Sequence, residues 1–205
     1  VTIALLAMVV ATILGTLAAI GIHAMKKRPQ SFMMTLTNLP NTMPDIVTGI
    51  SLMLLFLFTK VDRGYVTMLL AHITFDTPYV ILSVLPKLKQ MNRHTYEAAL
   101  DLGATPMYAL FHVIIPECMP GIITGAMLAF TLSLDDFVIS YFTSGNGFQT
   151  LPIRIYNMTK KTVTPKMYAL ATIIFFVILA LLIMTNLIDS DKPKTAKPAL
   201  SLIHI

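Results

Sequence analysis

Apolar residues recur along the chain in long runs that short polar segments separate. Five such runs stand out, at residues 1–25, 32–58, 65–85, 119–142 and 167–188. Each is long enough for an α-helix to cross the hydrocarbon core of a bilayer, which takes about 20 residues. Because a segment in lipid must satisfy its own backbone polar groups, runs of this kind form membrane-spanning helices. The pattern therefore predicts an all-α fold, a polytopic transmembrane helical bundle with five spans in this chain.

The composition indicates that lipid is the main solvent of this chain. Hydrophobic residues make up 56% of the 205 residues and charged residues only 12%, against about 25% charged residues in an average soluble domain. The net charge of +5 does not indicate nucleic acid binding, because the basic residues lie at the ends of the runs and form no stripe with interleaved aromatic residues. The single cysteine, Cys118, excludes an intramolecular disulfide and supplies no metal site. We expect it to be a small buried residue.

The basic residues predict the orientation of the bundle. All 15 Lys and Arg residues lie outside the five runs, and the two sides of the membrane receive nine and six of them. The side with nine carries Lys26, Lys27, Arg28, Lys87, Lys89, Arg93, Lys192, Lys194 and Lys197. Since cytoplasmic loops carry the excess of Lys and Arg, this side is predicted to be cytoplasmic. The loop 144–165 then lies outside, where it can face an external partner.

One transmembrane domain accounts for residues 1–190, and a polar tail with two Lys-Pro pairs follows at 191–205. We expect the tail to be cytoplasmic and disordered. The first run is no secretory signal, because it is too long, lacks a basic segment before it and ends in three basic residues. Since the chain starts at Val1 inside this run, we expect it to continue a longer protein.

The segment between the third and fourth runs is too polar to cross a membrane and carries the signals of two short helices. Asn92 or Thr95 can cap the first helix, and Gly103 can end it in the left-handed conformation. Thr105 and Pro106 then supply a cap and a proline at the first position of a second helix. We therefore predict a helical hairpin on the cytoplasmic side.

This hairpin, about residues 91–116, also carries a spaced motif. In chain order the motif consists of Glu97, Ala98, Ala99, Gly103, Val113, Ile115 and Pro116, with three residues before the glycine and nine after it. It resembles the EAA loop of bacterial ABC importer permeases, in which Ile and Leu stand at the places of Val113 and Ile115. The resemblance implies the type I ABC importer permease fold, with a coupling helix that docks onto a separate cytoplasmic ATPase.

The residue types of the hairpin suit such docking. Ala98 and Ala99 keep a helix face flat, whereas Glu97 and Asp101, four residues apart, share one face and can meet basic side chains or backbone donors of a partner. An amphipathic helix that lies on the membrane surface is the alternative. Helices of that kind favour Lys and Arg over acids, so we prefer the docking interpretation.

Acidic residues inside the predicted spans are the candidate substrate path. Four of the ten Asp and Glu residues lie there, namely Asp45, Asp76, Asp135 and Asp136. A carboxylate at the centre of a bilayer costs at least about 2.5–3.5 kcal/mol, so these residues should face the bundle interior or an aqueous path. With no Lys or Arg in the spans, a cationic ligand is the expected partner. Asp135 and Asp136 would point about 100° apart on one helix.

Other polar and aromatic residues in the spans have simpler interpretations. Asp45 follows Pro44, so it can equally cap a break in the second span. We expect His72 to form hydrogen bonds with a neighbouring helix and not to relay protons. Aromatic residues near the acids could bind a cation, but we interpret them as packing or lipid-facing residues: Phe75, Tyr79, Phe137, Tyr141 and Phe142.

A narrower resemblance covers nearly the whole chain apart from the tail. The stretches 43–47, 71–75, 97–103, 130–136 and 151–156 are similar to those of the C-type permease of bacterial spermidine/putrescine importers. The resemblance implies a polyamine permease of the bacterial inner membrane with about six spans, the first of them missing here. It also implies a second homologous permease subunit, an ATPase dimer and an extracytoplasmic polyamine-binding protein as partners.

Alternative functions lack the residues that they need. An intramembrane aspartyl protease would carry a Gly-any-Gly-Asp sequence, which is absent. No phosphate-binding Walker loop and no His-Glu-any-any-His zinc motif occurs, so we expect no catalytic residue, cofactor or metal on this chain. A secondary transporter would have no use for the hairpin. An ABC importer permease for another cationic solute is the alternative that stays open.

Overall fold

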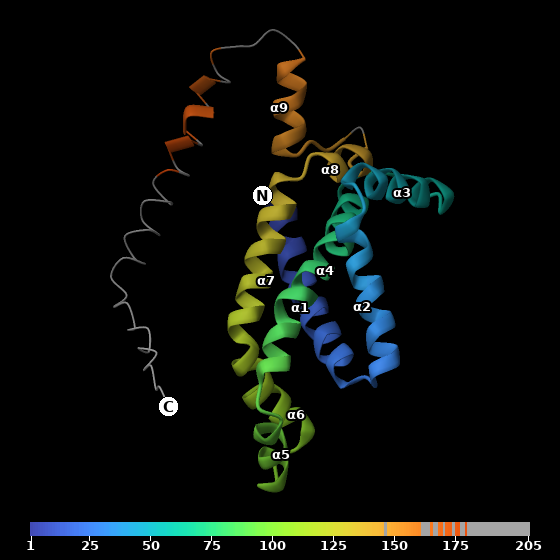
Figure 1. The fold of residues 1–205 in the computed structure, drawn as a ribbon. Helices are drawn as coiled ribbons and strands as arrows, with labels where there is room; N and C mark the ends of the chain where they lie inside the picture. The colour runs from blue at the N-terminus through green and yellow to red at the C-terminus, as the bar shows by residue number, and fades with distance from the viewer. Residues whose placement is uncertain are drawn as a thin grey trace, which may run out of the picture. The chain divides into compact units, whose positions relative to one another are not determined.

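A computed structural model describes residues 1–145 and 147–160, together with scattered positions between 165 and 179. The regular structure in the described residues is helical, as predicted. The helices are α1 (Thr2–Ala24), α2 (Lys27–Thr42), α3 (Asp45–Phe58), α4 (Tyr65–Gln90), α5 (Arg93–Asp101), α6 (Pro106–Ala109), the π-helical turn η1 (Leu110–Ile114), α7 (Ile115–Asp135), α8 (Val138–Thr143) and α9 (Leu151–Thr159) (Figure 1). The chain forms two compact units, Val1–Arg154 and Ile155–Ile205. Most of the predicted fifth span, 167–188, and the whole tail, 191–205, lie outside the described residues.

Three helices of the first unit are long and apolar enough to cross a membrane. They are α1, α4 and the continuous helix Pro106–Asp135, which contains α6, η1 and α7. The helices α2 and α3 together also pass this test, but they meet at an angle of 105°. The described residues therefore contain three candidate spans, or four if the bent pair counts as one.

The second predicted span, 32–58, is thus not one straight helix. The break lies between α2 and α3, where Met43 is extended with φ −90° and ψ 142°. A proline disfavours the helical conformation at the residue before it, so Pro44 ends α2 and starts α3 in a new direction. Hydropathy does not register this change of direction, because the run is apolar on both sides of the break, but the break behind Pro44 that the sequence allowed is confirmed.

The fourth predicted span, 119–142, is also divided. Its helix starts earlier, because α7 continues the helix of the hairpin, and it ends earlier, at Asp135. Asp136 is extended, with φ −64° and ψ 121°, and the short helix α8 follows. The two divided runs both have their breaks at the end of the bundle away from the hairpin (Figure 1).

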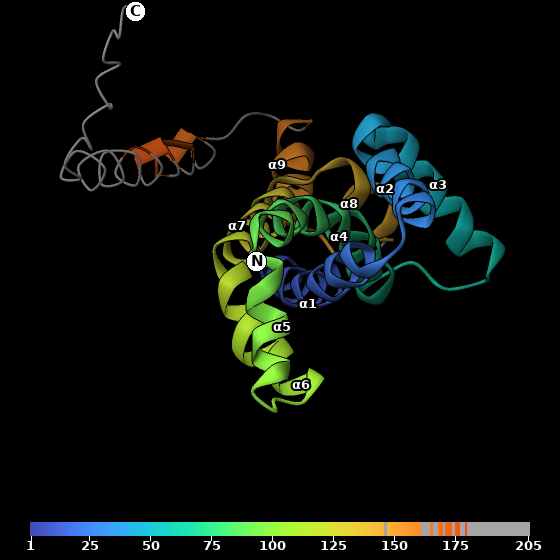
Figure 2. The same ribbon diagram turned by 60° about the horizontal axis from the view of Figure 1, so that its bottom comes forward.

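The helices α1, α4 and α7 lie side by side and form the core (Figures 1 and 2). Val80 of α4 sits between Gly15 of α1 and Gly125 of α7. A Cβ atom at Gly15 would lie only 2.6 Å from Val80 Cβ, and one at Gly125 would lie 3.1 Å from Val80 Cα. Small residues at such crossings let helices approach closely where lipid supplies no hydrophobic force between them. The buried Cys118 belongs to the same core, as expected.

The two faces of α1 differ in the way that a membrane helix requires. Small residues dominate its buried face, among them Ala4, Ala7, Ala11, Gly15 and Ala19. Its other face exposes large apolar side chains, namely Leu5, Leu6, Val9, Ile13, Leu14 and Leu17. In lipid such a face carries no penalty, whereas water would disfavour so large an apolar surface.

Basic residues gather at one end of the first unit. Lys26 precedes α2, Lys27 and Arg28 begin it, and the last turn of α4 carries Lys87 and Lys89. Both groups lie toward the end from which the hairpin of α5 and α6 projects (Figure 1). The loop with Lys60 and Arg63 lies at the opposite end, where α4 begins.

Candidate functional site

The first helix of the hairpin is built as its sequence predicts. The Asn92 side chain accepts a hydrogen bond from His94 N at 3.0 Å and so caps α5. At the other end Gly103 has φ +88°, which glycine adopts without the penalty that a Cβ atom brings. Ala104 N donates to Ala99 O at 3.1 Å and Gly103 N donates to Leu100 O at 2.9 Å. This pair of bonds is the Schellman motif, which satisfies carbonyls at a helix end.

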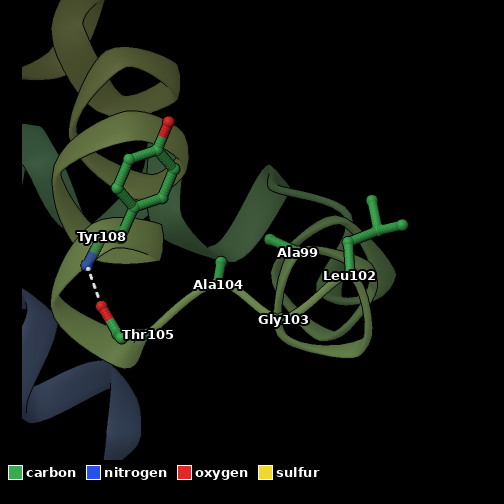
Figure 3. A pocket seen from close by; sticks show the side chains of 6 residues that line it. All are labelled: Ala99, Leu102, Gly103, Ala104, Thr105 and Tyr108. Atoms are coloured by element: carbon green, nitrogen blue, oxygen red, sulfur yellow. Dashed lines mark hydrogen bonds between the residues drawn. The ribbon is translucent and has the colours of Figure 1, made fainter.

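The second helix restarts two residues later. Thr105 Oγ1 accepts a hydrogen bond from Tyr108 N at 3.3 Å, and Pro106 occupies the first turn of α6. Between the two helices lies an open hollow of about 500 Å³ (Figure 3). Leu102 and Tyr108 stand on its two sides in this view, and Ala99, Gly103, Ala104 and Thr105 complete its lining. Leu102 is 89% exposed, so the tip of the hairpin offers an apolar side chain to a partner.

The motif residues on α5 form a surface. Glu97, Ala98 and Asp101 are exposed, and Ala99 is half-buried beside the hollow. Glu97 Oε2 lies 3.2 Å from His94 Nδ1, one turn earlier on the same helix. The arrangement fits the flat helix face with two acids that the sequence predicts.

A π-helical turn joins the hairpin to α7, and sequence reasoning did not predict it. In η1 the Ile115 N–H donates to Leu110 O, five residues back. Pro116 comes next and has no N–H, and a proline ring inside a helix also clashes with the carbonyl four residues before it. A wider turn relieves this clash, so the final proline of the motif accounts for the π-helical turn. The Tyr108 and His112 rings stack here with centroids 3.9 Å apart.

The adjacent acids Asp135 and Asp136 do not share one helix, so the expectation of a 100° separation was wrong. Asp135 is the last residue of α7 and is exposed. Asp136 lies in the break, and its carboxylate accepts hydrogen bonds from Ile139 N at 3.1 Å and Ser140 N at 2.7 Å. Its role is to cap α8, because the first N–H groups of a helix have no partner within the helix.

A histidine lies beside one of these acids, although the predicted spans contain no Lys or Arg. His72 of α4 lies with Nε2 3.6 Å from Asp136 Oδ2. Its two ring nitrogens contact Ser133 Oγ at 2.7 Å and Ser140 Oγ at 3.0 Å. The expected hydrogen bonding of His72 to neighbouring helices is confirmed. Sequence reasoning missed its partners, because Ser133 and Ser140 lie more than 60 residues away and no spacing rule connects them.

The other two acids differ in exposure. Asp76 lies one turn after His72 on α4, is fully buried, and neither of its carboxylate oxygens has a hydrogen-bond partner among the described residues. Asp45 is exposed at the first position of α3, where the partial positive charge of the helix N-terminus favours a carboxylate. The N-cap position of α3 is held by Pro44 and not by Asp45.

The aromatic residues near the acids pack mainly against one another, as interpreted from the sequence. Phe75 is buried in a second core cluster and its ring centroid lies 5.4 Å from that of Tyr79. The Phe137 and Tyr141 centroids lie 5.5 Å apart.

Comparison with known proteins places these features in a family. The family described as "Binding-protein-dependent transport system inner membrane component" matches residues 11–192. The spermidine/putrescine transport system permease protein PotC of Haemophilus influenzae is 39% identical over 188 residues, which are 92% of this chain and 73% of the relative.

Two relatives from Escherichia coli agree with this match. The protein of the same name there is 38% identical over 193 residues, 94% of this chain and 73% of the relative. The putrescine transport system permease protein PotI is 43% identical over 180 residues, 84% of this chain and 64% of the relative. Since the family match covers most of the chain, this protein belongs to the binding-protein-dependent transport system inner membrane components, the permeases of ABC transporters.

Proposed function

We propose that this chain is the permease subunit of an ATP-driven importer that moves polyamines, such as spermidine and putrescine, across a bacterial cytoplasmic membrane. The observation that carries the proposal is the similarity to polyamine permeases over 92–94% of the chain, which includes the hairpin and every acid-bearing helix. ATP hydrolysis belongs to a separate subunit, so no catalytic residue is assigned here.

The proposal includes an architecture and a set of partners. Residues 1–190 form one type I permease domain with five spans: α1, the bent pair α2–α3, α4, Pro106–Asp135 and the run 167–188. The hairpin and the C-terminus face the cytoplasm. A second homologous permease covers part of the exposed apolar surface, an ATPase dimer binds the hairpin, and an extracytoplasmic polyamine-binding protein delivers the substrate.

The hairpin surface supports the ATPase as a partner. Glu97 and Asp101 present charge, and Ala98 and Ala99 permit close approach of the helix to another surface. Gly103 fixes the turn that exposes the apolar tip, while Pro116 sits where the hairpin continues into a span. These six residues together are the proposed coupling surface.

The four acids support a cationic substrate, with different roles for the exposed and the buried pair. Asp45 and Asp135 are exposed on this chain and can contact an ammonium group directly. The side chains of Asp136 and Asp76 are buried. Asp136, whose carboxylate accepts two backbone N–H groups, contributes negative potential from within, whereas a buried carboxyl that, like Asp76, has no hydrogen-bond partner in the described part of the chain favours its neutral form. A linear polycation passing Asp135 gains charge-assisted hydrogen bonds that a neutral solute lacks.

Polyamine uptake by cells that express the whole importer tests this path. Asp135→Asn and Asp45→Asn remove one charge each and keep the side-chain volume. We expect each to lower uptake by about tenfold, the equivalent of about 1.4 kcal/mol. Asp62→Asn is the matched control, because Asp62 is exposed in the loop after α3. Normal uptake by both path variants, with the complex present at its usual level, would show that these acids do not contact the substrate.

A further inference from the structure

His72 is a buried side chain of the first unit that bonds to two other helices, and the mechanism proposed above gives it no role. It is 1% exposed, and it reaches two other helices at once. Nδ1 contacts Ser133 Oγ of α7 at 2.7 Å, and Nε2 contacts Ser140 Oγ of α8 at 3.0 Å. A single ring therefore joins α4, the last turn of α7 and the first turn of α8.

This arrangement satisfies a neutral imidazole in either tautomer. One nitrogen of the neutral ring donates and the other accepts. Both neighbours are serine hydroxyls, which can donate or accept as required. The buried ring thus needs no charge to hold both helices, and Asp136 beside it is already occupied by two backbone N–H groups of α8.

The joined helices meet where the fourth apolar run breaks. The break consists of Asp136 and Phe137, between the end of α7 and the start of α8. A second bond, from Thr67 Oγ1 to Thr143 O at 3.0 Å, ties the far end of α8 to α4. The helix α8 is therefore held at both ends, while α7 near the break is held to α4 by the Ser133 contact.

Asp135 is the residue whose direction this arrangement determines. It is the last residue of α7, two residues after Ser133 and one before Asp136, and it is exposed. A change in the angle between α7 and α8 turns its carboxylate. Asp135 needs the correct direction only if it contacts the substrate, so the following inference rests on the proposed cation path.

We propose that His72 is a positioning residue for that path. By holding Ser133 and Ser140, it fixes the junction of α7 and α8 and so directs the Asp135 carboxylate toward the passing ammonium group. His72 does not touch the substrate, because it is enclosed by its own chain. Its effect on transport passes through Asp135.

Uptake by the complete importer tests this role. His72→Ala removes both contacts and is expected to lower polyamine uptake about tenfold, since misplacing a group by about 1 Å can cost up to about 100-fold. His72→Asn keeps a polar atom near Nδ1, and His72→Gln keeps one near Nε2, so each should recover part of the loss. Thr74→Ala is the matched control on α4, because Thr74 is exposed and, among the described residues, its hydroxyl bonds to Leu70 O of its own helix.

The double variant His72→Ala with Asp135→Asn separates positioning from a general structural defect. If His72 acts through Asp135, the double variant takes up polyamine at the rate of Asp135→Asn alone. If the double variant instead loses uptake by the product of the two single-variant losses, the proposal is overturned. Normal uptake by His72→Ala in an intact complex would overturn it as well. If His72→Ala fails to assemble, Ser133→Ala and Ser140→Ala each remove one contact, and normal uptake by both would overturn it equally.

The same measurements distinguish failure of the inference from failure of the proposed function. If Asp135→Asn itself takes up polyamine at the normal rate, the cation path at Asp135 fails and the positioning role fails with it. If Asp135→Asn is impaired while His72→Ala is normal, the path stands and only the role of His72 is lost.

Discussion

Replacing Gly15 by alanine should weaken the three-helix core by a predictable amount. The added Cβ would lie 2.6 Å from Val80 Cβ, 2.7 Å from Val80 Cγ1 and 3.1 Å from Thr77 O. Carbon atoms prefer separations of about 3.5–4.0 Å, and none of these neighbours is the end of a flexible side chain. The helices α1 and α4 must therefore separate by about 1 Å, and overpacking of this kind costs about 1–3 kcal/mol.

Thermal unfolding of the purified importer measures this effect. A change of 1 kcal/mol shifts the midpoint of a domain of this size by about 2–4 °C, so Gly15→Ala should lower it by several degrees. Gly21→Ala is the matched control in the same helix, because a Cβ there meets nothing within 4 Å. Equal midpoints for the two variants would refute the close approach of α1 and α4.

Three further changes probe the hairpin and the α4–α8 contact. Gly103→Ala places a Cβ at φ +88°, which costs about 1–2 kcal/mol. It should weaken binding of the ATPase in a pull-down by about 5- to 30-fold. Gly64→Ala is the control and should not weaken binding, because Gly64 lies in extended backbone with open space around it. Pro116→Ala supplies an N–H that can bond to the His112 carbonyl, so η1 should become regular α-helix. A structure of the complex would show this change, and a π turn that persists would contradict the role given to the proline. Thr67→Val removes the hydrogen bond to α8 and leaves its buried carbonyl partner unsatisfied, at a cost of about 1–3 kcal/mol in unfolding free energy; an unchanged midpoint would contradict this contact.

The hairpin was predictable from its sequence because its signals are local. The caps at Asn92 and Thr105 and the stop at Gly103 each act on residues within a few positions. Chain order and backbone sterics decide such features, so they can be predicted without knowledge of the rest of the fold. The π turn was missed although its cause, Pro116, is equally local, because the proline was interpreted only as part of a motif.

The breaks in the membrane helices were less predictable. Hydropathy is averaged over a whole run, so it does not register a change of direction between two apolar segments. Pro44 gave a local sign of the first break, and Asp136 gave a sign of the second, since an aspartate before a short apolar segment is a helix-start signal. The break at Pro44 was considered, because Asp45 behind it could cap a new helix, whereas Asp136 was interpreted only through its charge.

The individual contacts around the acids could not be predicted from the sequence. The contact of His72 with Ser133 and Ser140 depends on how α4, α7 and α8 pack, and that packing depends on small residues such as Gly125. Sequence identified which carboxylates are unusual in lipid. Only the fold distinguishes the exposed Asp135 from the buried Asp76 and from Asp136, which caps α8.

Competition uptake tests whether this permease moves polyamines. Cells without their own polyamine importers would express the complete system with this permease, and uptake of labelled spermidine would be measured against excess unlabelled putrescine, spermidine, lysine or a neutral sugar. We expect uptake that requires this chain and that only the polyamines suppress. Uptake that persists without the chain, or that lysine suppresses as strongly as putrescine does, would contradict it.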